Sequence, residues 1–174
     1  MIFISPYRFM IKSIFIVLSL SFVFSNSFSQ TNFYNVAKEI TILEKTSLTI
    51  KGDFINEKKG TKEGEIANGG EIRLEKNLIN NTSNNFFVTN AGRVEFYGDS
   101  LQEIISDSAI YFHTLEVNKP KGELQLQTNI RLLDSLILTK GNLHMNSFDI
   151  QLLFTGILYA ETNEKRLYGD LSYD

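Results

Sequence analysis

The sequence has no cysteine and little histidine, with two histidines in 174 residues. Without cysteine, neither a disulfide framework nor the lipid-attachment cysteine of a bacterial lipoprotein can form. Two histidines provide little for a zinc site, which needs three or four converging ligands. The G-x-S-x-G, H-E-x-x-H, Walker and EF-hand spacings are also missing. We therefore predict no enzymatic activity, no cofactor and no metal.

The sequence also lacks an apolar run of typical membrane-spanning length, which is about 20 residues. Its longest apolar run, residues 14–24, is interrupted by serines toward its end and follows the basic residues Arg8 and Lys12. A short apolar segment after positive charges is typical of a secretory signal peptide. An uncleaved membrane anchor is the alternative interpretation.

A cleavage site for this signal peptide is indicated by small residues at the end of the apolar run. Ser27 and Ser29 are two positions apart, as small residues before a signal-peptidase site are. We predict a signal peptide over residues 1–29, a mature chain that begins at Gln30, and a location outside the cell or on its surface. Met10 is an alternative start, because the residues after it form a complete signal peptide.

The mature chain is acidic. Removing residues 1–29 removes two basic residues and no acid, which takes the formal net charge from −3 to −5. This charge argues against nucleic acid as a partner, because nucleic-acid binders carry a concentrated basic face. The remaining length is enough for one domain with a substantial core. We divide it into an N-terminal connection and first strand over residues 30–46 and a repeat domain over residues 47–174.

Pairs of apolar residues separated by one residue recur at nearly constant intervals. The intervals are 24 and 22 residues at first and 21 residues afterwards. The six pairs are Leu48/Ile50, Ile72/Leu74, Val94/Phe96, Leu115/Val117, Leu136/Leu138 and Ile157/Tyr159. A short strand repeated at this spacing is typical of a solenoid, in which each copy buries its apolar face by stacking on its neighbours.

The repeat predicts an all-β fold, a right-handed parallel β-helix of about six rungs, where a rung is one full circuit of the coil. The paired apolar residues should point inward, and their neighbours Thr49, Arg73, Glu95 and Glu116 should point outward. Residues 31–38 show no period and are expected to connect the leader to the domain. An antiparallel β-sandwich is the alternative, because it too has short strands at regular spacing.

The later rungs are expected to contain two or three strands separated by turns. In the fifth, Leu136/Leu138, Leu143/Met145 and Ile150/Leu152 recur every seven residues around corners at residues 140–142 and 146–147. In the fourth, the corner is Lys119-Pro120-Lys121-Gly122, where the missing N–H of proline is harmless. Glycine and asparagine at the corners favour strands over a coiled coil.

These motifs resemble a known family. A G-x-V-x-F-x-G strand at residues 92–98, a glutamine-containing turn, an F-x-x-L-x-V strand at residues 112–117 and L-x-L-T-x-G-x-L at residues 136–143 are similar to the β-solenoid repeats of adhesin-like surface proteins from gliding bacteria with type IX secretion. The resemblance covers roughly residues 47–169. It implies an exported structural or adhesive segment with no catalytic residues to transfer.

The strongest candidates for chemistry are Glu95 and Glu116, which should occupy the same outward position on consecutive rungs. Stacked carboxylates raise each other's pKa and can act as acid and base or nucleophile in glycoside chemistry. The simpler interpretation is that Arg73 pairs with Glu95, and that Lys119 or Lys121 balances Glu116. We keep the two glutamates as a catalytic alternative only.

Other polar residues are interpreted as structural. The strand pattern places His113 and His144 on different faces, so they should not share a metal. Asp53 and Asp99 each follow glycine and should cap their turns.

The functional prediction is an exported, non-catalytic structural or adhesion-type module of the bacterial cell surface. Its partner would be a protein or a polysaccharide. The alternative is a β-helix that binds or cleaves a polysaccharide, with Tyr97 and Tyr111 as exposed sugar-stacking residues. Since the next apolar pair would be due beyond Asp174, we also predict self-association through an uncovered C-terminal edge, or a truncated product.

Overall fold

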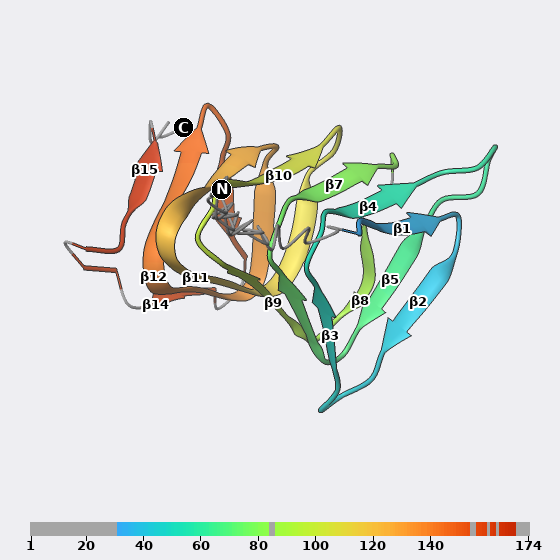
Figure 1. Ribbon diagram of the computed structural model, residues 1–174, viewed down its shortest axis with the longest axis horizontal. Helices are drawn as coiled ribbons and strands as arrows, with labels where there is room; N and C mark the ends of the chain where they lie inside the picture. Colours follow the sequence, from blue (N-terminus) through green and yellow to red (C-terminus); the bar gives the residue numbers. More distant parts are fainter. Residues whose placement is uncertain (1–30, 84–85, 154–155, 160, 163, 170–174) are drawn as a thin grey trace, which may run out of the picture.

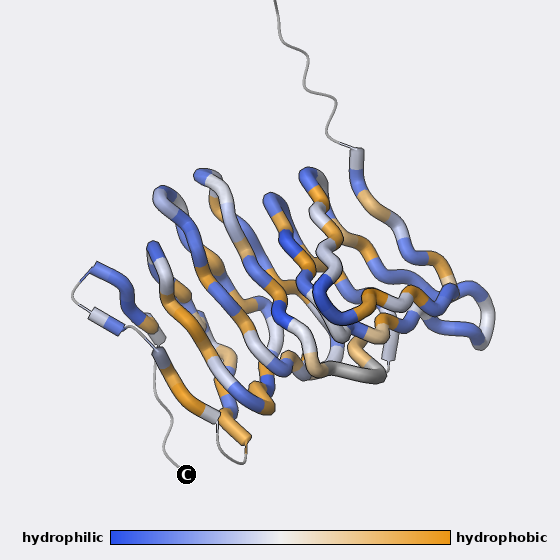
Figure 2. The backbone as a smooth tube through the Cα atoms, turned by 90° about the horizontal axis from the view of Figure 1, so that it is seen from below, coloured by the Kyte–Doolittle hydropathy of each residue, from blue (hydrophilic) through white to orange (hydrophobic). Residues whose placement is uncertain are grey.

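The protein is a coil of parallel β-strands in about six rungs, as seen in a computed structural model (Figure 1). The structure describes residues 31–83, 86–153, 156–159, 161–162 and 164–169. Within these ranges there are strands and connections but no helix. Seen from below, the rungs lie side by side along the long axis of the molecule (Figure 2).

Each of the early rungs contributes one strand to each of three faces. The first face contains β1 (Phe33–Val36), β4 (Phe54–Glu57), β7 (Leu78–Asn81) and β10 (Gln102–Ser106). The second face contains β2 (Glu39–Ile42), β5 (Glu65–Asn68) and β8 (Phe87–Asn90). The third face contains β3 (Ser47–Ile50), β6 (Glu71–Leu74) and β9 (Arg93–Tyr97).

In the later rungs, two long strands run through the corners that separate the faces. They are β11 (Ile110–Gln127) and β12 (Ile130–Asn146), and β12 pairs with β13 (Ile150–Leu152), β14 (Ile157–Tyr159) and β15 (Leu167–Gly169). The sequence predicts separate strands with turns between them here. Instead the backbone bends at Gly122 and Gly141, with φ of 70° and 76°, a left-handed conformation that glycine adopts without steric cost.

The register confirms the predicted repeat in five of its six copies. Leu48, Ile72, Val94, Leu115 and Leu136 are partners on consecutive strands of the third face. The strand ladders are parallel, so the chain is a β-solenoid and the antiparallel sandwich is wrong. Neighbouring strands in such a ladder lie about 4.8 Å apart.

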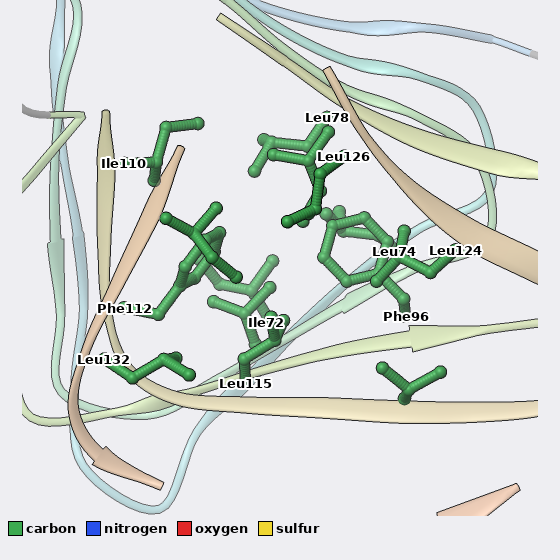
Figure 3. Packing of buried hydrophobic residues seen from close by; sticks show 14 of the residues in the cluster. Ile72, Leu74, Leu78, Phe96, Ile110, Phe112, Leu115, Leu124, Leu126 and Leu132 are labelled. Atoms are coloured by element: carbon green, nitrogen blue, oxygen red, sulfur yellow. The ribbon is translucent and has the colours of Figure 1, made fainter. Parts of the chain in front are cut away.

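The inward side chains of the three faces form one continuous apolar core. Ile72, Leu74, Phe96, Leu115 and Leu124 point into the interior from different faces (Figure 3). A second part of the core is a chain of aromatic contacts with ring centroids 4.5–5.5 Å apart, made by Phe33, Phe54, Phe86, Phe87 and Phe112. Without disulfides, this burial is the main stabilising term.

The sixth copy of the repeat differs from the prediction. Leu158, not Ile157, is the partner of Leu136, so the last interval is 22 residues instead of 21. The extra residue in the preceding loop shifts the strand by one position, and a shift of one reverses the two faces. As a result Ile157 and Tyr159 point outward and are each 48% exposed.

The N-terminal segment is also more ordered than predicted. The sequence predicts a plain connection over residues 31–38, but β1 pairs with β4 from Phe33↔Phe54 to Val36↔Glu57. The alternation of inward apolar and outward polar residues in β1 is hard to recognise because its second inward residue is polar. That residue is Asn35, which is 2% exposed.

Asn35 begins a ladder of buried asparagines at the corner after the first face. Its Nδ2 donates to Asn56 Oδ1 at 2.9 Å, and Asn56 Nδ2 donates to Asn80 Oδ1 at 2.9 Å. Asn80 Nδ2 then donates to Ser106 Oγ at 3.1 Å. Each amide thus connects one rung to the next inside the corner, where an unpaired polar group would cost free energy.

A second ladder precedes the first face, and in it the Asp53 side chain binds the backbone of the next rung instead of capping its own turn as predicted. The backbone N–H of Asp53 donates to Asn32 Oδ1, and Asp53 Oδ1 accepts the N–H of Asn77, both at 3.1 Å. Asn77 Oδ1 in turn accepts the N–H of Glu103 at 2.9 Å. Side chains at equivalent corner positions therefore bind the backbone of the following rung.

Candidate functional site

The candidate carboxylates lie on the outer surface of the third face, as predicted. Thr49, Arg73, Glu95 and Glu116 form one row across β3, β6, β9 and β11. The adjacent row contains Glu71 and Arg93. Since the side chains of a parallel ladder stack in register, Glu95 and Glu116 are neighbours on consecutive rungs.

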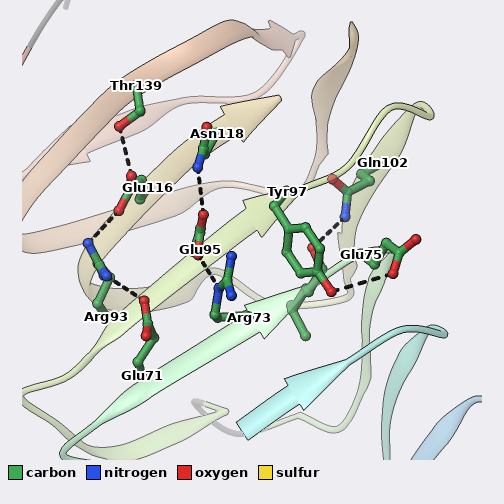
Figure 4. Close-up of polar contacts among 11 residues, drawn as sticks. Glu71, Arg73, Glu75, Arg93, Glu95, Tyr97, Gln102, Glu116, Asn118 and Thr139 are labelled. Atoms are coloured by element: carbon green, nitrogen blue, oxygen red, sulfur yellow. Dashed lines mark hydrogen bonds and ion pairs between the residues drawn. The ribbon is translucent and has the colours of Figure 1, made fainter. Parts of the chain in front are cut away.

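Glu95 is held by two donors. Arg73 Nε lies 2.5 Å from Glu95 Oε2, and Asn118 Nδ2 donates to Glu95 Oε1 at 2.8 Å (Figure 4). The residue is 4% exposed. Burial raises the pKa of Glu95, but the hydrogen bonds from Arg73 and Asn118 outweigh it, so this pKa lies below its usual value.

Glu116 is held by a different pair of partners from those predicted. Arg93 Nη1 lies 2.6 Å from Glu116 Oε2, and Thr139 Oγ1 donates to Glu116 Oε1 at 2.7 Å (Figure 4). Arg93 also pairs with Glu71. Arg93 is diagonal to Glu116 across the ladder, because its direct partner is Thr114. A long side chain spans such a diagonal. The prediction that Lys119 or Lys121 balances Glu116 is wrong.

Lys121 and Lys119 have other contacts. Lys121 forms an exposed ion pair of 3.5 Å with Asp99, so the structure shows Asp99 in an ion pair rather than in the predicted turn cap. Lys119 points into the coil, where its Nζ lies 2.5 Å from Gln102 Oε1. Gln102 in turn donates to the carbonyl oxygens of Leu74 and Lys76 at 3.0 and 2.7 Å.

The environment of Lys119 changes its acidity. The residue is 0% exposed, and burial, together with the nearby charge of Lys76, lowers the pKa of Lys119 to about 8. Sequence reasoning missed this buried amine. The sequence does indicate this inward position, because Lys119 lies two and four residues after Val117 and Leu115, and residues two apart on a strand point to the same side.

The chemical consequence concerns the two glutamates. A glycosidase needs one carboxyl that stays protonated as the general acid. Glu95 has a lowered pKa and two donors, which favours its ionised form. Glu95 therefore suits the role of general acid poorly, and both oxygens of Glu116 accept bonds from Arg93 and Thr139 in the same network.

The two tyrosines predicted to be exposed sugar-stacking residues are half-buried. The guanidinium of Arg73 lies 4.8 Å from the ring centroid of Tyr97, and that of Arg131 lies 5.1 Å from the ring centroid of Tyr111. These are cation–π distances. Each ring thus has one face covered by an arginine, which corrects the prediction.

The two histidines are separated in the structure. His113 lies in the corner before the third face, with Nδ1 3.4 Å from Thr114 Oγ1. His144 lies on the outer side of the first face, where its Nε2 is 3.1 Å from Glu123 and its ring stacks on Tyr168 at 4.9 Å. Among the described residues, no three His, Asp or Glu side chains gather as metal ligands would.

A shallow groove of ≈ 530 Å³ crosses four rungs at the corner between the second and third faces. Its lining combines small residues such as Gly70 and Gly92 with the longer side chains of Lys45, Arg93 and His113. The glycines have a packing role, because a Cβ on Gly92 would lie 2.2 Å from Gly70 O. The close contact between rungs therefore explains why glycine lines the groove.

Comparisons of the chain with protein-family models, with curated proteins and with solved structures found no match. The register of its own strands identifies the chain as a parallel β-solenoid. The resemblance to adhesin-like surface proteins stays a prediction. Within the described ranges, no helix could span a membrane.

Proposed function

We propose that the chain is an exported, non-catalytic structural or adhesion-type module of the bacterial cell surface. Three sequence features support this proposal: the signal peptide predicted over residues 1–29, the absence of cysteine, and the repeat motifs between residues 92 and 143. The resemblance of those motifs to adhesin-like proteins of type IX secretion supports the adhesive role. The β-solenoid supplies a rigid scaffold with long outer surfaces.

The observation that carries the proposal is the pairing of charges on the third face. Glu95 and Glu116 each accept bonds from two side chains, and Arg93 links Glu71 to Glu116. Charges that neutralise one another suit a polar outer surface that only needs to stay hydrated. Catalysis would instead require a carboxyl whose pKa lies near the operating pH.

Surface exposure is tested on cells that produce the full chain with a C-terminal epitope tag. We expect added protease or antibody to reach the tag on intact cells, whereas a cytoplasmic marker stays protected. A matched variant that lacks residues 1–29 should stay inside the cell. Retention of the full chain in the cytoplasm would contradict the proposal.

Catalysis is tested with the purified mature chain on a panel of polysaccharides, by release of reducing ends. We expect no release above that of a Glu95→Gln, Glu116→Gln double variant. Cleavage by the wild-type chain that the double variant loses would establish the alternative, a polysaccharide-cleaving β-helix.

A further inference from the structure

A group of lysines gathers at the corner between the first and second faces, away from the ion-pair network. The connection between β4 and β5 reaches out beyond the three faces (Figure 1). At its tip, Lys59 and Lys62 exchange backbone hydrogen bonds of 2.8 and 3.3 Å. Gly60 between them has a φ of 65°, which suits the first central position of a tight hairpin turn.

Lys59 and Lys62 line a pocket of ≈ 360 Å³ together with Lys38, Val36 and Ala37. The backbone on both sides of the pocket is fixed by the coil. Ala37 N donates to Glu57 O, and Glu65 N donates to Lys38 O, both at 2.9 Å. Lysines from two consecutive rungs are thus held around one hollow.

The lining of this pocket carries three positive charges and no acid. Within the described part of the chain, Lys38, Lys59 and Lys62 form no ion pair. Acids flank the pocket without lining it: Glu57 is the partner of Val36 on β4, Glu39 follows Lys38 in the sequence, and Glu63 accepts bonds from Ser83. Three ammonium groups that line one pocket repel one another, and an anionic group between them would relieve that repulsion.

An apolar surface adjoins the lysines. Val36, at the edge of the pocket, is 37% exposed, and Tyr34 is 56% exposed. Both point outward from β1 because they are two residues apart on a strand. An aromatic ring and an aliphatic side chain next to cationic donors suit a ligand with an apolar face and an anionic substituent, as a charged sugar has.

We propose that this pocket binds a carboxylated sugar unit of an acidic polysaccharide. The proposal rests on the adhesion-type function and names its ligand class. A nucleic acid is disfavoured because acids outnumber bases in the chain, 20 to 17, whereas nucleic-acid binders present a concentrated basic face. A free inorganic anion would use the lysines but not Tyr34 and Val36.

The test is a calorimetric titration of the purified mature chain with a uronate oligosaccharide. The comparison ligands are a neutral oligosaccharide of the same length, inorganic phosphate and a single-stranded oligonucleotide. We expect the uronate to bind, the neutral sugar to bind at least tenfold more weakly, and phosphate to compete only at far higher concentration. Comparable binding of the neutral sugar, of phosphate alone or of the oligonucleotide would overturn the proposal.

Variants locate the site. Lys59→Gln with Lys62→Gln should weaken uronate binding at least tenfold, and Tyr34→Ala should weaken it severalfold. Lys58→Gln is the matched control, because Lys58 is exposed on the same connection but does not line the pocket. Unchanged affinity in the double variant, or an equal loss in the control, would overturn the assignment. Normal surface exposure of a chain that does not bind uronate would leave the proposed function intact.

Discussion

Arg73 and Glu95 form an ion pair of 2.5 Å between consecutive rungs, in which the carboxylate side chain is 6% and the arginine side chain 39% exposed. Glu95 is therefore the buried partner of this ion pair, and Arg73 is the more exposed one. Exposed ion pairs contribute about 0–1 kcal/mol to stability, whereas hydrogen bonds to charged and largely buried groups contribute about 1.5–3 kcal/mol. This difference sets the expected effect of changing Glu95.

Replacing Glu95 with glutamine should lower the free energy of unfolding by about 1.5–3 kcal/mol. The amide of glutamine cannot accept at both ends, so either Arg73 or Asn118 loses its acceptor. Urea denaturation of the mature chain measures the change, with the exposed Glu44→Gln as control. Equal losses in the two variants would show that the network does not stabilise the fold. From the sequence alone, Glu95 is a solvated residue and the same substitution should have little effect.

Replacing Phe96 with aspartate should unfold the domain. Phe96 is completely buried in the core, and an unpaired buried charge costs several kcal/mol against a total stability of about 5–15 kcal/mol. Tyr97→Phe, at the next position, is the control, because it removes only a 3.4 Å hydrogen bond to Glu75. Circular dichroism should show a folded control and an unfolded aspartate variant. A folded aspartate variant would mean that the strand faces are reversed.

Replacing Asn56 with alanine should destabilise the protein by about 1–3 kcal/mol, the cost of leaving a buried polar group unsatisfied. Asn56 accepts from Asn35 and donates to Asn80 and to Gly64 O at 2.8 Å. Asn81→Ala, at an exposed position of β7, should change stability by less than about 0.5 kcal/mol. Thermal unfolding of both variants compares them, and equal melting temperatures would contradict a stabilising ladder.

The buried Lys119 leads us to predict a rise of stability with pH. Its pKa is about 8 in the folded chain against an ordinary value of 10.5, so between these values the unfolded chain binds more protons than the folded chain. Stability then increases with pH, by about 1.5 kcal/mol between pH 8 and 9.5 for this one group. The pH range of this prediction ends below 10 because burial raises the pKa of Tyr97. At higher pH the folded chain holds the Tyr97 proton that the unfolded chain loses, so stability falls with pH there.

The measurement is urea denaturation at pH 8.0 and 9.5 for the wild type and for Lys119→Met. Methionine fills similar space and does not titrate, so the variant should lose most of the increase. If the increase is the same in both proteins, another group causes it.

The period of two along each strand, together with the interval of about 21 residues, was sufficient to predict the rows of the third face. It placed Glu95 beside Glu116 and Arg73 beside Glu95, because both relationships follow from register. It could not predict which cation reaches Glu116, since the diagonal bond from Arg93 depends on side-chain length and direction. The inward position of Lys119 was readable from parity, but a charged residue on an inward position is rare enough to be overlooked.

The face reversal at Leu158 was not readable from the sequence. Ile157, Leu158 and Tyr159 are all apolar, so the pattern fits either face equally well. Only the length of the preceding connection decides between them. The lysine pocket could not be predicted from the sequence either, because Lys38 and Lys59 lie 21 residues apart and come together only when the rungs are stacked.

The asparagine ladder joins side chains that are 21 and 24 residues apart in sequence, always from one rung to the next. Each amide within this ladder thus donates to the following rung and accepts from the preceding one. Removal of one complete circuit would bring together two rungs whose asparagine donors and acceptors already match. Removal of half a circuit would place the donors of one rung away from the acceptors of the next. The length of such a protein can therefore change in evolution by whole circuits, which makes its reach adjustable in steps of about 4.8 Å.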